Sequence, residues 1–299
     1  MNPFLDWCFK YLFGTEENKP NLIGFLNLML MPQSPIVDVE FMNNESLPSS
    51  PDIKECVFDI VCKDQNGDRY LIEVQNGKMI EIKDRIIYYT CRLMDRMGKR
   101  GSGWNYSDIK RVYTICLMNF TFESNPKLRR DIQLYDIDDN TLFSDKINII
   151  MLQLPCLKAE SLGECKANYE LLLYLLKEMQ AGMKTIDELK QEIANTTLPQ
   201  ETKEVFYRVL DTADVGSLSE KDQMRYESAL KNYLDTMSCI EYATVKVREE
   251  GKAEGLAEGK AEGESMAKAS IAKSMKAEGM DVALISRYTG LPIEQIEAL

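Results

Sequence analysis

The chain has 299 residues, of which 44% are hydrophobic and 28% are charged, and its formal net charge is −12 at pH 7. This length predicts one or two domains with a sizeable core, and the negative charge argues against broad non-specific attraction to nucleic acid. No stretch approaches the roughly 18 apolar residues of a membrane-spanning helix, and the first residues show no basic leader or cleavage site. We therefore expect a cytoplasmic protein without a membrane partner.

The side chains available for chemistry are restricted because the sequence has no histidine. This excludes serine–histidine and cysteine–histidine catalysis and histidine metal ligands. The eight cysteines form no C-x-x-C pair, so we expect reduced thiols and no structural zinc site. Acid–base or metal chemistry must come from carboxylates, lysine, tyrosine or water, and oxygen ligands favour Mg²⁺ or Mn²⁺.

The first half of the chain alternates helical and extended patterns. Helices are predicted over residues 4–13 and 20–30, followed by a strand at 35–42. The stretch "VFDIVCKDQNGDRYLIEVQ", residues 57–75, predicts two strands joined by a tight turn. A helix at 81–99 and strands at 111–118 and 147–155 complete the pattern. The order helix, strand, strand, strand, helix, strand predicts an α/β (α+β) core, in which helices flank a mixed sheet.

The second half is helical throughout. We divide the chain into a core at 1–156, a helical appendage at 157–245 and a tail at 246–299 that ends in two short helices. Within the tail, "EEGKAEGLAEGKAEGES" repeats A-E-G every four residues. Each glycine inside a helix costs roughly 1 kcal/mol relative to alanine, so an isolated helix here is expected to be weak. Either a close helix–helix contact in an oligomer offsets this cost, or the segment is a solvated linker.

The hairpin carries one acid on each strand, Asp59 and Glu73. A two-residue Asn66-Gly67 turn would oppose Asp59 to Val74, whereas a loop of three or five residues opposes Asp59 to Glu73. The odd loop length is favoured because it separates both acids from the apolar residues Phe58, Ile60, Ile72 and Val74, as a sheet packed on one side requires. Opposed side chains lie about 5 Å apart, and a divalent ion between them would remove their repulsion.

A cationic stripe is predicted on the helix at 81–99. Residues 78–111 hold nine Lys or Arg against four Asp or Glu. At 100° per residue, the apolar stripe lies opposite a polar face formed by Arg85, Tyr88, Tyr89, Arg92, Arg96 and Lys99. Such a face is either simply solvated or a track for DNA phosphates, with the tyrosines available to stack on bases.

Three segments together resemble a known family. "DWCFKYLFGTEENKPNLIGFLNLML", "FDIVCKDQNGDRYLIEVQ" and "DRIIYYTCRLM" are similar to the Rpn family of recombination-promoting nucleases, also described as transposases, within the PD-(D/E)XK nuclease superfamily. The similarity covers roughly residues 3–155 and extends weakly to the tail. It implies a restriction-endonuclease-like core around the pattern D-x13-E-x-Q.

The resemblance implies roles for individual residues. Asp59, Glu73 and the Val74 carbonyl would bind Mg²⁺ or Mn²⁺, and Asp6 on the first helix fits the additional acid of the superfamily. Gln75 stands where most of the superfamily has lysine, and it would orient the attacking water without supplying charge. Lys10, which shares a helix face with Asp6, is expected to contact DNA together with the stripe on the helix at 81–99.

The sequence thus predicts a magnesium-dependent DNA endonuclease that needs no small-molecule cofactor and acts as a homodimer, because cutting both strands requires two sites. One alternative is a nucleic-acid-binding or regulatory protein with an inactive site, which the net negative charge favours. Another is an interaction protein that assembles through its C-terminal helices.

Overall fold

The computed structural model describes all residues of the chain except 43–44, 47–55, 58 and 99–104. The chain divides into two compact units, residues 1–231 and 232–299. The first unit contains the sheet and the helices around it, and it holds every site residue predicted from the sequence that the structure describes.

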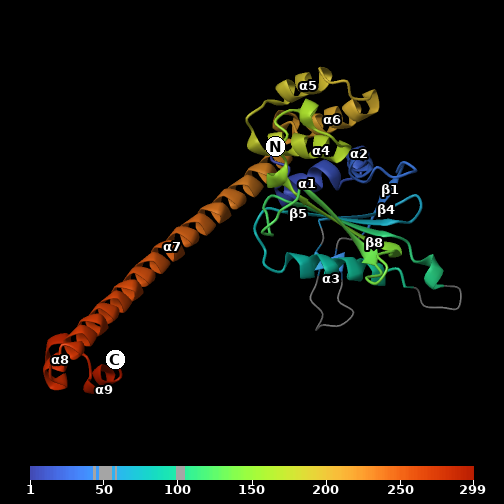
Figure 1. The fold of residues 1–299 in the computed structure, drawn as a ribbon. Coiled ribbons are helices and arrows are strands. Elements are labelled where there is room, and N and C mark those ends of the chain that lie inside the picture. The colour runs from blue at the N-terminus through green and yellow to red at the C-terminus, as the bar shows by residue number, and fades with distance from the viewer. Residues whose placement is uncertain (43–44, 47–55, 58, 99–104) are drawn as a thin grey trace. The chain divides into compact units, whose positions relative to one another are not determined.

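A six-stranded mixed sheet lies at the centre of the first unit (Figure 1), in the strand order β1-β4-β5-β6-β8-β7. Neighbouring strands β5, β6 and β8 run parallel, and the remaining pairs are antiparallel. The strands are β1 (Val39–Phe41), β4 (Ile60–Asp64), β5 (Arg69–Gln75), β6 (Val112–Met118), β7 (Arg129–Tyr135) and β8 (Leu142–Gln153). A separate two-stranded sheet joins β2 (Glu45–Ser46) and β3 (Cys56–Val57).

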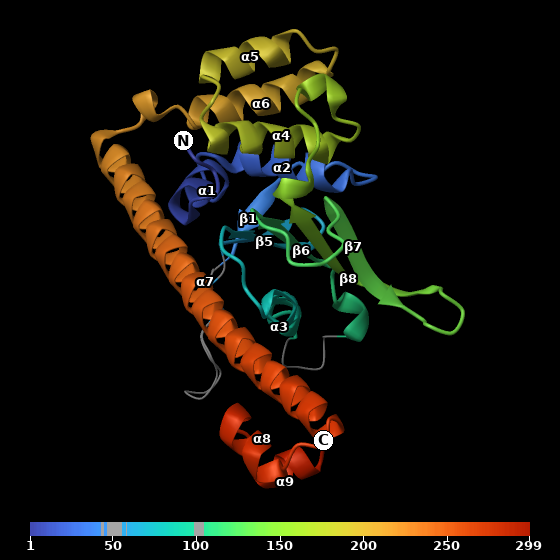
Figure 2. The same cartoon turned by 60° about the vertical axis from the view of Figure 1, so that its left-hand side comes forward.

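Helices cover both faces of the six-stranded sheet. Helices α1 (Asp6–Phe13) and α2 (Lys19–Leu30) lie on one face, and α3 (Ile82–Asp95) lies on the other (Figure 1). Figure 2 shows α4 (Asn168–Ala181), α5 (Ile186–Ala194) and α6 (Gln200–Thr212) gathered on the side of α2 away from the sheet. Short 3₁₀ turns occur at Tyr106–Asp108, Leu154–Cys156, Leu162–Glu164 and Val215–Ser217.

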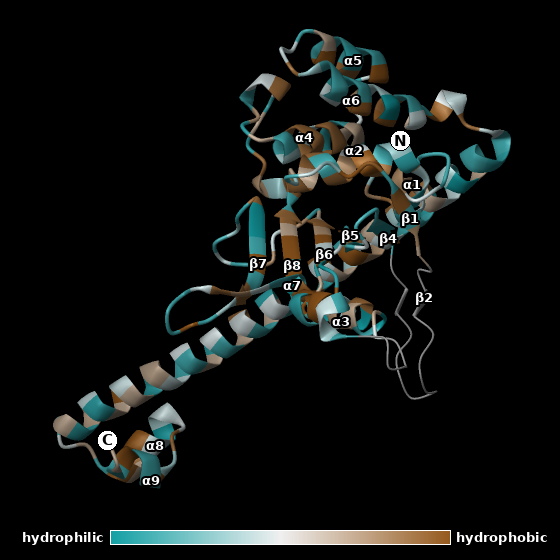
Figure 3. Cartoon of the chain, turned by 90° about the vertical axis from the view of Figure 1, so that its right-hand side faces the viewer, coloured by the Kyte–Doolittle hydropathy of each residue, from teal (hydrophilic) through white to brown (hydrophobic). Residues whose placement is uncertain are grey.

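The sheet is therefore packed on both faces, not on one as the hairpin pattern suggested. Ile60 and Ile72 enter the core beneath α1 and α2. Val61 and Leu71 point the opposite way and are buried together with Leu93 of α3. The nearly continuous apolar sequence of β6 follows from this double burial, and Figure 3 shows β6 and β8 as largely hydrophobic.

The helices predicted as an appendage share one hydrophobic core with the sheet. Residues of α4, α5 and α6 lie in the same buried cluster as those of α1, α2, β4 and β5. The division of the chain into functional domains at residues 156 and 245 stays a prediction. Strand β7 was not predicted, because its sequence RRDIQLY is largely polar and exposed at the sheet edge.

The C-terminal part contains α7 (Glu220–Ala277), a continuous helix of 58 residues, followed by α8 (Val282–Thr289) and α9 (Ile293–Glu297). The two short terminal helices confirm the prediction and enclose a small core of their own, together with Ala272. A Cβ added to any of the four repeat glycines, from Gly251 to Gly263, would meet nothing within 4 Å in this chain. Among the described residues, no helix is long and apolar enough to cross a membrane.

The contact between α2 and α6 can be tested at Gly24. A Cβ at this position would lie 2.5 Å from Cγ1 of Val205, so the side chain or a helix must move. We expect Gly24→Ala to lower the free energy of unfolding by about 1–3 kcal/mol, as overpacking does, and Val205→Ala in the same chain to recover part of the loss. Urea denaturation measures both. Gly163→Ala, where an added Cβ would meet Oγ of Ser161 at an ordinary 3.9 Å, is the control, and an equally harmless Gly24→Ala would contradict the close contact.

Candidate active site

The turn of the β4–β5 hairpin has three residues, one of the two odd lengths considered. The amide of Asp64 donates to the carbonyl of Asp68 at 2.9 Å, and Gly67 has φ +84°, the left-handed conformation that glycine adopts without strain. The carboxylate of Asp64 accepts from the amides of Asn66 and Asp68, both at 2.9 Å, and from the Tyr70 hydroxyl at 3.1 Å. Local side-chain hydrogen bonds thus fix the loop length.

This turn sets the register on which the two acids depend. The paired residues end at Ile60 and Ile72, and Asp59, directly before β4, reaches Glu73 through its backbone amide, as the predicted register requires. Ile60 and Ile72 lie on the other face, as expected, whereas Phe58 lies outside the described residues. A two-residue turn would have placed Glu73 among the apolar side chains beneath α1 and α2.

Hydrogen bonds hold the two carboxylates together. The amide of Val74 donates to Oδ2 of Asp59 at 2.7 Å, and the amide of Asp59 donates to Oε1 of Glu73 at 3.3 Å. The Gln75 side-chain amide donates to Oε2 of Glu73 at 3.4 Å. Glu73 is only 2% exposed, so its position depends on these partners and not on solvent.

Helix α1 brings a cation and a third acid to the edge of the pair. Nζ of Lys10 lies 2.7 Å from Oδ1 of Asp6 and 3.8 Å from Oδ1 of Asp59. Asp6 and Lys10 are one helical turn apart, so they meet on one side of α1. Lys10, expected only as a DNA contact, therefore also faces the carboxylate pair.

Two asparagines missed in the sequence tie α1 to the sheet. The Asn76 side chain donates to the carbonyl of Phe4, and Asn119 donates to the side-chain oxygen of Asn76 at 3.3 Å. These bonds connect the start of α1 with the ends of β5 and β6. The only available signal was a polar residue directly after E-x-Q.

Helix α3 adds a second cation from the opposite face of the sheet. Nη2 of Arg85 lies 3.4 Å from Oε2 of Glu73, and the guanidinium stacks on Tyr89 at 4.9 Å from the ring centroid. Tyr88 is 39% exposed and lies 6.4 Å from Tyr89 between ring centroids. Arg85 is therefore a neighbour of the acids and not part of a uniformly solvated stripe.

The rest of the stripe is less exposed than expected. The Arg92 side chain is 17% exposed and lies 3.8 Å from Asp95, and Arg96 is half-buried. Lys99 lies outside the described residues. A continuous phosphate track along α3 stays a prediction.

Both acids of the pair have raised pKa values, because each is buried and lies close to another acid. Burial raises the pKa of Glu73 from 4.5 to about 8, repulsion from Asp59 adds to the rise, and Arg85 opposes it. Burial also raises the pKa of Asp59 from 3.8 to about 6, while the amide of Val74 opposes the rise and the charge of Asp6 increases it. A bound cation would relieve both effects.

The donor set fits a hard divalent ion. Within the described ranges, no three His, Cys, Asp or Glu side chains form a group that could hold a metal. Mg²⁺, however, is commonly held by one or two carboxylates, with water and substrate phosphate completing its shell. The N–H and C=O of a strand residue point the same way, so the Val74 carbonyl faces the side on which its amide meets Asp59.

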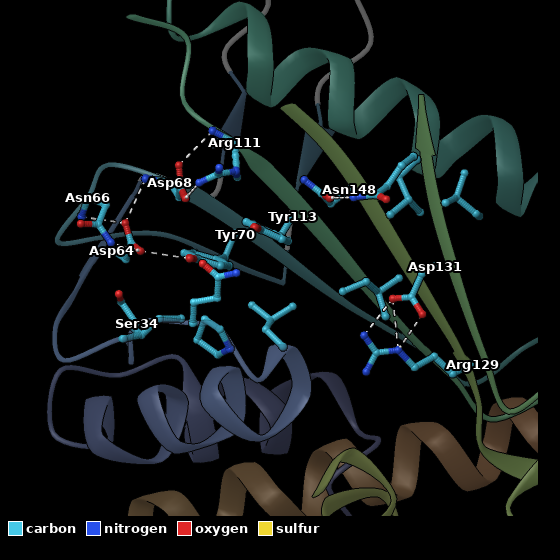
Figure 4. Close-up of a pocket in the computed structure, with 18 residues that line it drawn as sticks. Ser34, Asp64, Asn66, Asp68, Tyr70, Arg111, Tyr113, Arg129, Asp131 and Asn148 are labelled. Carbon is cyan, nitrogen blue, oxygen red and sulfur yellow. Dashed lines mark hydrogen bonds and ion pairs between the residues drawn. The ribbon is translucent and has the colours of Figure 1, made fainter. Parts of the chain in front are cut away.

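A cavity with a volume of about 620 Å³ lies elsewhere, at the opposite end of β5 (Figure 4). Asp68 lines it, five residues before Glu73 and thus about 17 Å away along the strand. The carboxylate of Asp64 accepts hydrogen bonds from the amides of the turn, and Arg111 lies 3.5 Å from Asp68. These acids stabilise the turn, and the cavity does not contain the predicted pair.

Comparison with known proteins gives one match. A family profile described as PD-(D/E)XK nuclease family transposase matches residues 3–243, which include the sheet, helices α1–α6 and the first part of α7. No curated protein matches, and no solved structure matches. The match extends well beyond residue 156, in agreement with the shared core of the sheet and helices α4–α6.

The carboxylate pair predicts a pH-dependent stability in the absence of metal. Because folding raises the pKa of Glu73 from 4.5 to about 8, its contribution to stability is complete at low pH and is lost as the pH rises through 8. The stability of the wild type relative to Glu73→Gln should therefore fall over this range, since the amide does not ionise. Urea denaturation in a chelator measures the difference, and a constant difference would contradict the burial of an ionisable pair.

Metal should reverse this loss. At pH 8 we expect Mn²⁺ or Mg²⁺ to raise the melting temperature of the wild type, because an ion at 100 times its dissociation constant contributes about 2.7 kcal/mol. Asp59→Asn and Glu73→Gln, which keep the hydrogen-bond acceptors, should respond much less. Differential scanning calorimetry is the measurement, and equal responses in all three proteins would place the ion elsewhere.

Proposed function

The chain belongs to the PD-(D/E)XK nuclease family of transposases, and from this membership and the opposed carboxylates we propose that it is a divalent-metal-dependent DNA endonuclease. The observation that carries the proposal is the contact between Asp59 and Glu73 at the end of the β4–β5 hairpin, close to Lys10 and Arg85. A buried pair of acids without a bound cation is unfavourable. In metal-assisted hydrolysis such a pair would bind the metal ion, which offsets this cost.

Asp59, Glu73 and the Val74 carbonyl would hold Mg²⁺ or Mn²⁺. Such an ion lowers the pKa of a bound water and stabilises the charge that develops on the phosphate. Gln75 donates from its amide nitrogen to Glu73, which leaves its side-chain oxygen to accept a hydrogen bond from the attacking water and orient it. Asp6 holds Lys10 at the rim of the site at 2.7 Å.

DNA would approach through the cations of α1 and α3. Positive charge near the acids offsets locally the net charge of −12, and contacts to phosphate oxygens position a duplex without reading its sequence. We assign this role to Lys10, Arg85, Tyr88, Tyr89, Arg92, Arg96 and Lys99.

A second function is a DNA-binding protein with an inactive site. Gln75 favours it, because an amide cannot supply the charge of the lysine found at that position in most of the superfamily. The two functions differ in a direct assay, since an inactive protein retards DNA in a gel but leaves it intact in the presence of any divalent ion.

Neutralising either acid should abolish cleavage. Asp59→Asn and Glu73→Gln should each lower the rate of plasmid nicking in Mg²⁺ by at least about 100-fold, the scale on which one preorganised electrostatic group acts. Circular dichroism checks that the fold persists. Cleavage at the wild-type rate by both variants would show that this pair is not the catalytic site.

We also propose a cytoplasmic homodimer, because two sites are needed to cut both strands and the seven described cysteines are free thiols, which suit a reducing compartment. Removal of residues 246–299, with the four repeat glycines, should convert dimer to monomer in light scattering. A truncated chain of unchanged oligomeric state would exclude the tail as the interface.

A further inference from the structure

Arg85 is held in one place by three contacts. Its Nη2 lies 3.4 Å from Oε2 of Glu73, its Nη1 lies 3.9 Å from the sulfur of Met79, and its guanidinium stacks on the Tyr89 ring. Holding a long side chain in one conformation costs conformational entropy, and a residue that served only as a mobile surface cation would gain nothing in return. The contacts indicate a guanidinium that is preorganised beside the acids.

The guanidinium still has donors to offer. Nη1 and Nη2 each carry two N–H groups, and the contacts above engage each nitrogen once. The Arg85 side chain is 31% exposed, so part of it faces solvent. It can therefore donate to a substrate oxygen without leaving Glu73.

The other cation near the acids, Lys10, contacts Asp6 more closely than it contacts the pair. Lys10 is closer to Asp6, at 2.7 Å, than to Asp59, at 3.8 Å, and Gln75 is neutral. Arg85 is the cation in direct contact with Glu73 among the described residues. Phosphodiester cleavage accumulates negative charge on the phosphate oxygens, and fixed cations at those oxygens supply much of the rate.

We propose that Arg85 is a catalytic residue that donates to a non-bridging oxygen of the phosphate being cut, and so supplies from α3 the charge that Gln75 cannot supply from β5. This proposal rests on the endonuclease function proposed above. It removes Arg85 from the general phosphate track and gives it a role in the chemical step. Arginine suits the role because its planar guanidinium can bind two oxygens at once.

A purely structural role makes a different prediction. If Arg85 only neutralised Glu73 in the metal-free protein, it would compete with the metal for that carboxylate. Its loss would then tighten metal binding and leave the rate at saturating metal unchanged. The two roles therefore separate in kcat and in metal affinity.

The test uses the full-length chain with Arg85→Gln, Arg85→Lys and a matched control, Lys83→Ala. Lys83 lies on the same helix, also pairs with an acid, Glu123 at 3.0 Å, and also lies over a ring, Phe122 at 5.3 Å. Plasmid nicking at saturating Mn²⁺ gives kcat and KM, calorimetric titration with Mn²⁺ alone gives the metal affinity, and melting temperatures report folding. The glutamine variant keeps a donor to Glu73, which favours a retained fold.

We expect Arg85→Gln to lower kcat by about 100-fold with KM for DNA and Mn²⁺ affinity little changed, Arg85→Lys to recover part of the rate, and Lys83→Ala to match the wild type. An unchanged kcat in Arg85→Gln with tighter Mn²⁺ binding overturns the proposal, and so does equal loss in Arg85→Gln and Arg85→Lys accompanied by lower melting temperatures. Failure of the wild type itself to cut DNA refutes the proposed function and is seen before any variant is compared.

Discussion

The odd-numbered loop of the β4–β5 hairpin is the constraint on which the site depends. Side chains alternate along a strand, so a loop shorter or longer by one residue would turn Glu73 to the other face of the sheet. Asp64 and Gly67 prevent this, the first by accepting the loop amides and the second by adopting φ +84°. The position of Glu73 near one end of the hairpin therefore depends on the turn geometry at the other end.

Burial on both faces reinforces the register. Ile60 and Ile72 contribute to the core beneath α1 and α2, while Val61 and Leu71 pack under α3. A slip would exchange these sets and place a carboxylate in an apolar layer, where an unpaired charge is costly. The same enclosure keeps Glu73 away from water and raises its pKa, so the geometry that fixes the position of the pair also sets its electrostatics.

The two helical layers contribute different charges to this edge of the sheet. Helix α1 supplies Lys10 together with Asp6, and Asn76 ties the start of α1 to the end of β5. Helix α3, from the opposite face, supplies Arg85. Because α4 and α6 pack on α2 and α5 packs on α6 in one shared core, the position of the site is coupled to a much larger part of the chain than the short motif suggests.

The sequence by itself determined the local features. Alternation and an Asn-Gly turn defined the hairpin, the apolar stripe defined α3, and the separation of acids from apolar residues selected the pairing of Asp59 with Glu73, because these signals arise between residues close in the chain. The tertiary structure alone decided that both faces of the sheet are covered, that β7 completes its edge, and that Arg85 meets Glu73. Those contacts join segments that are far apart in the sequence, and the local pattern of one segment does not identify the other. A polar edge strand, or a cation on a helix, has the same local sequence whether or not it contacts another side chain.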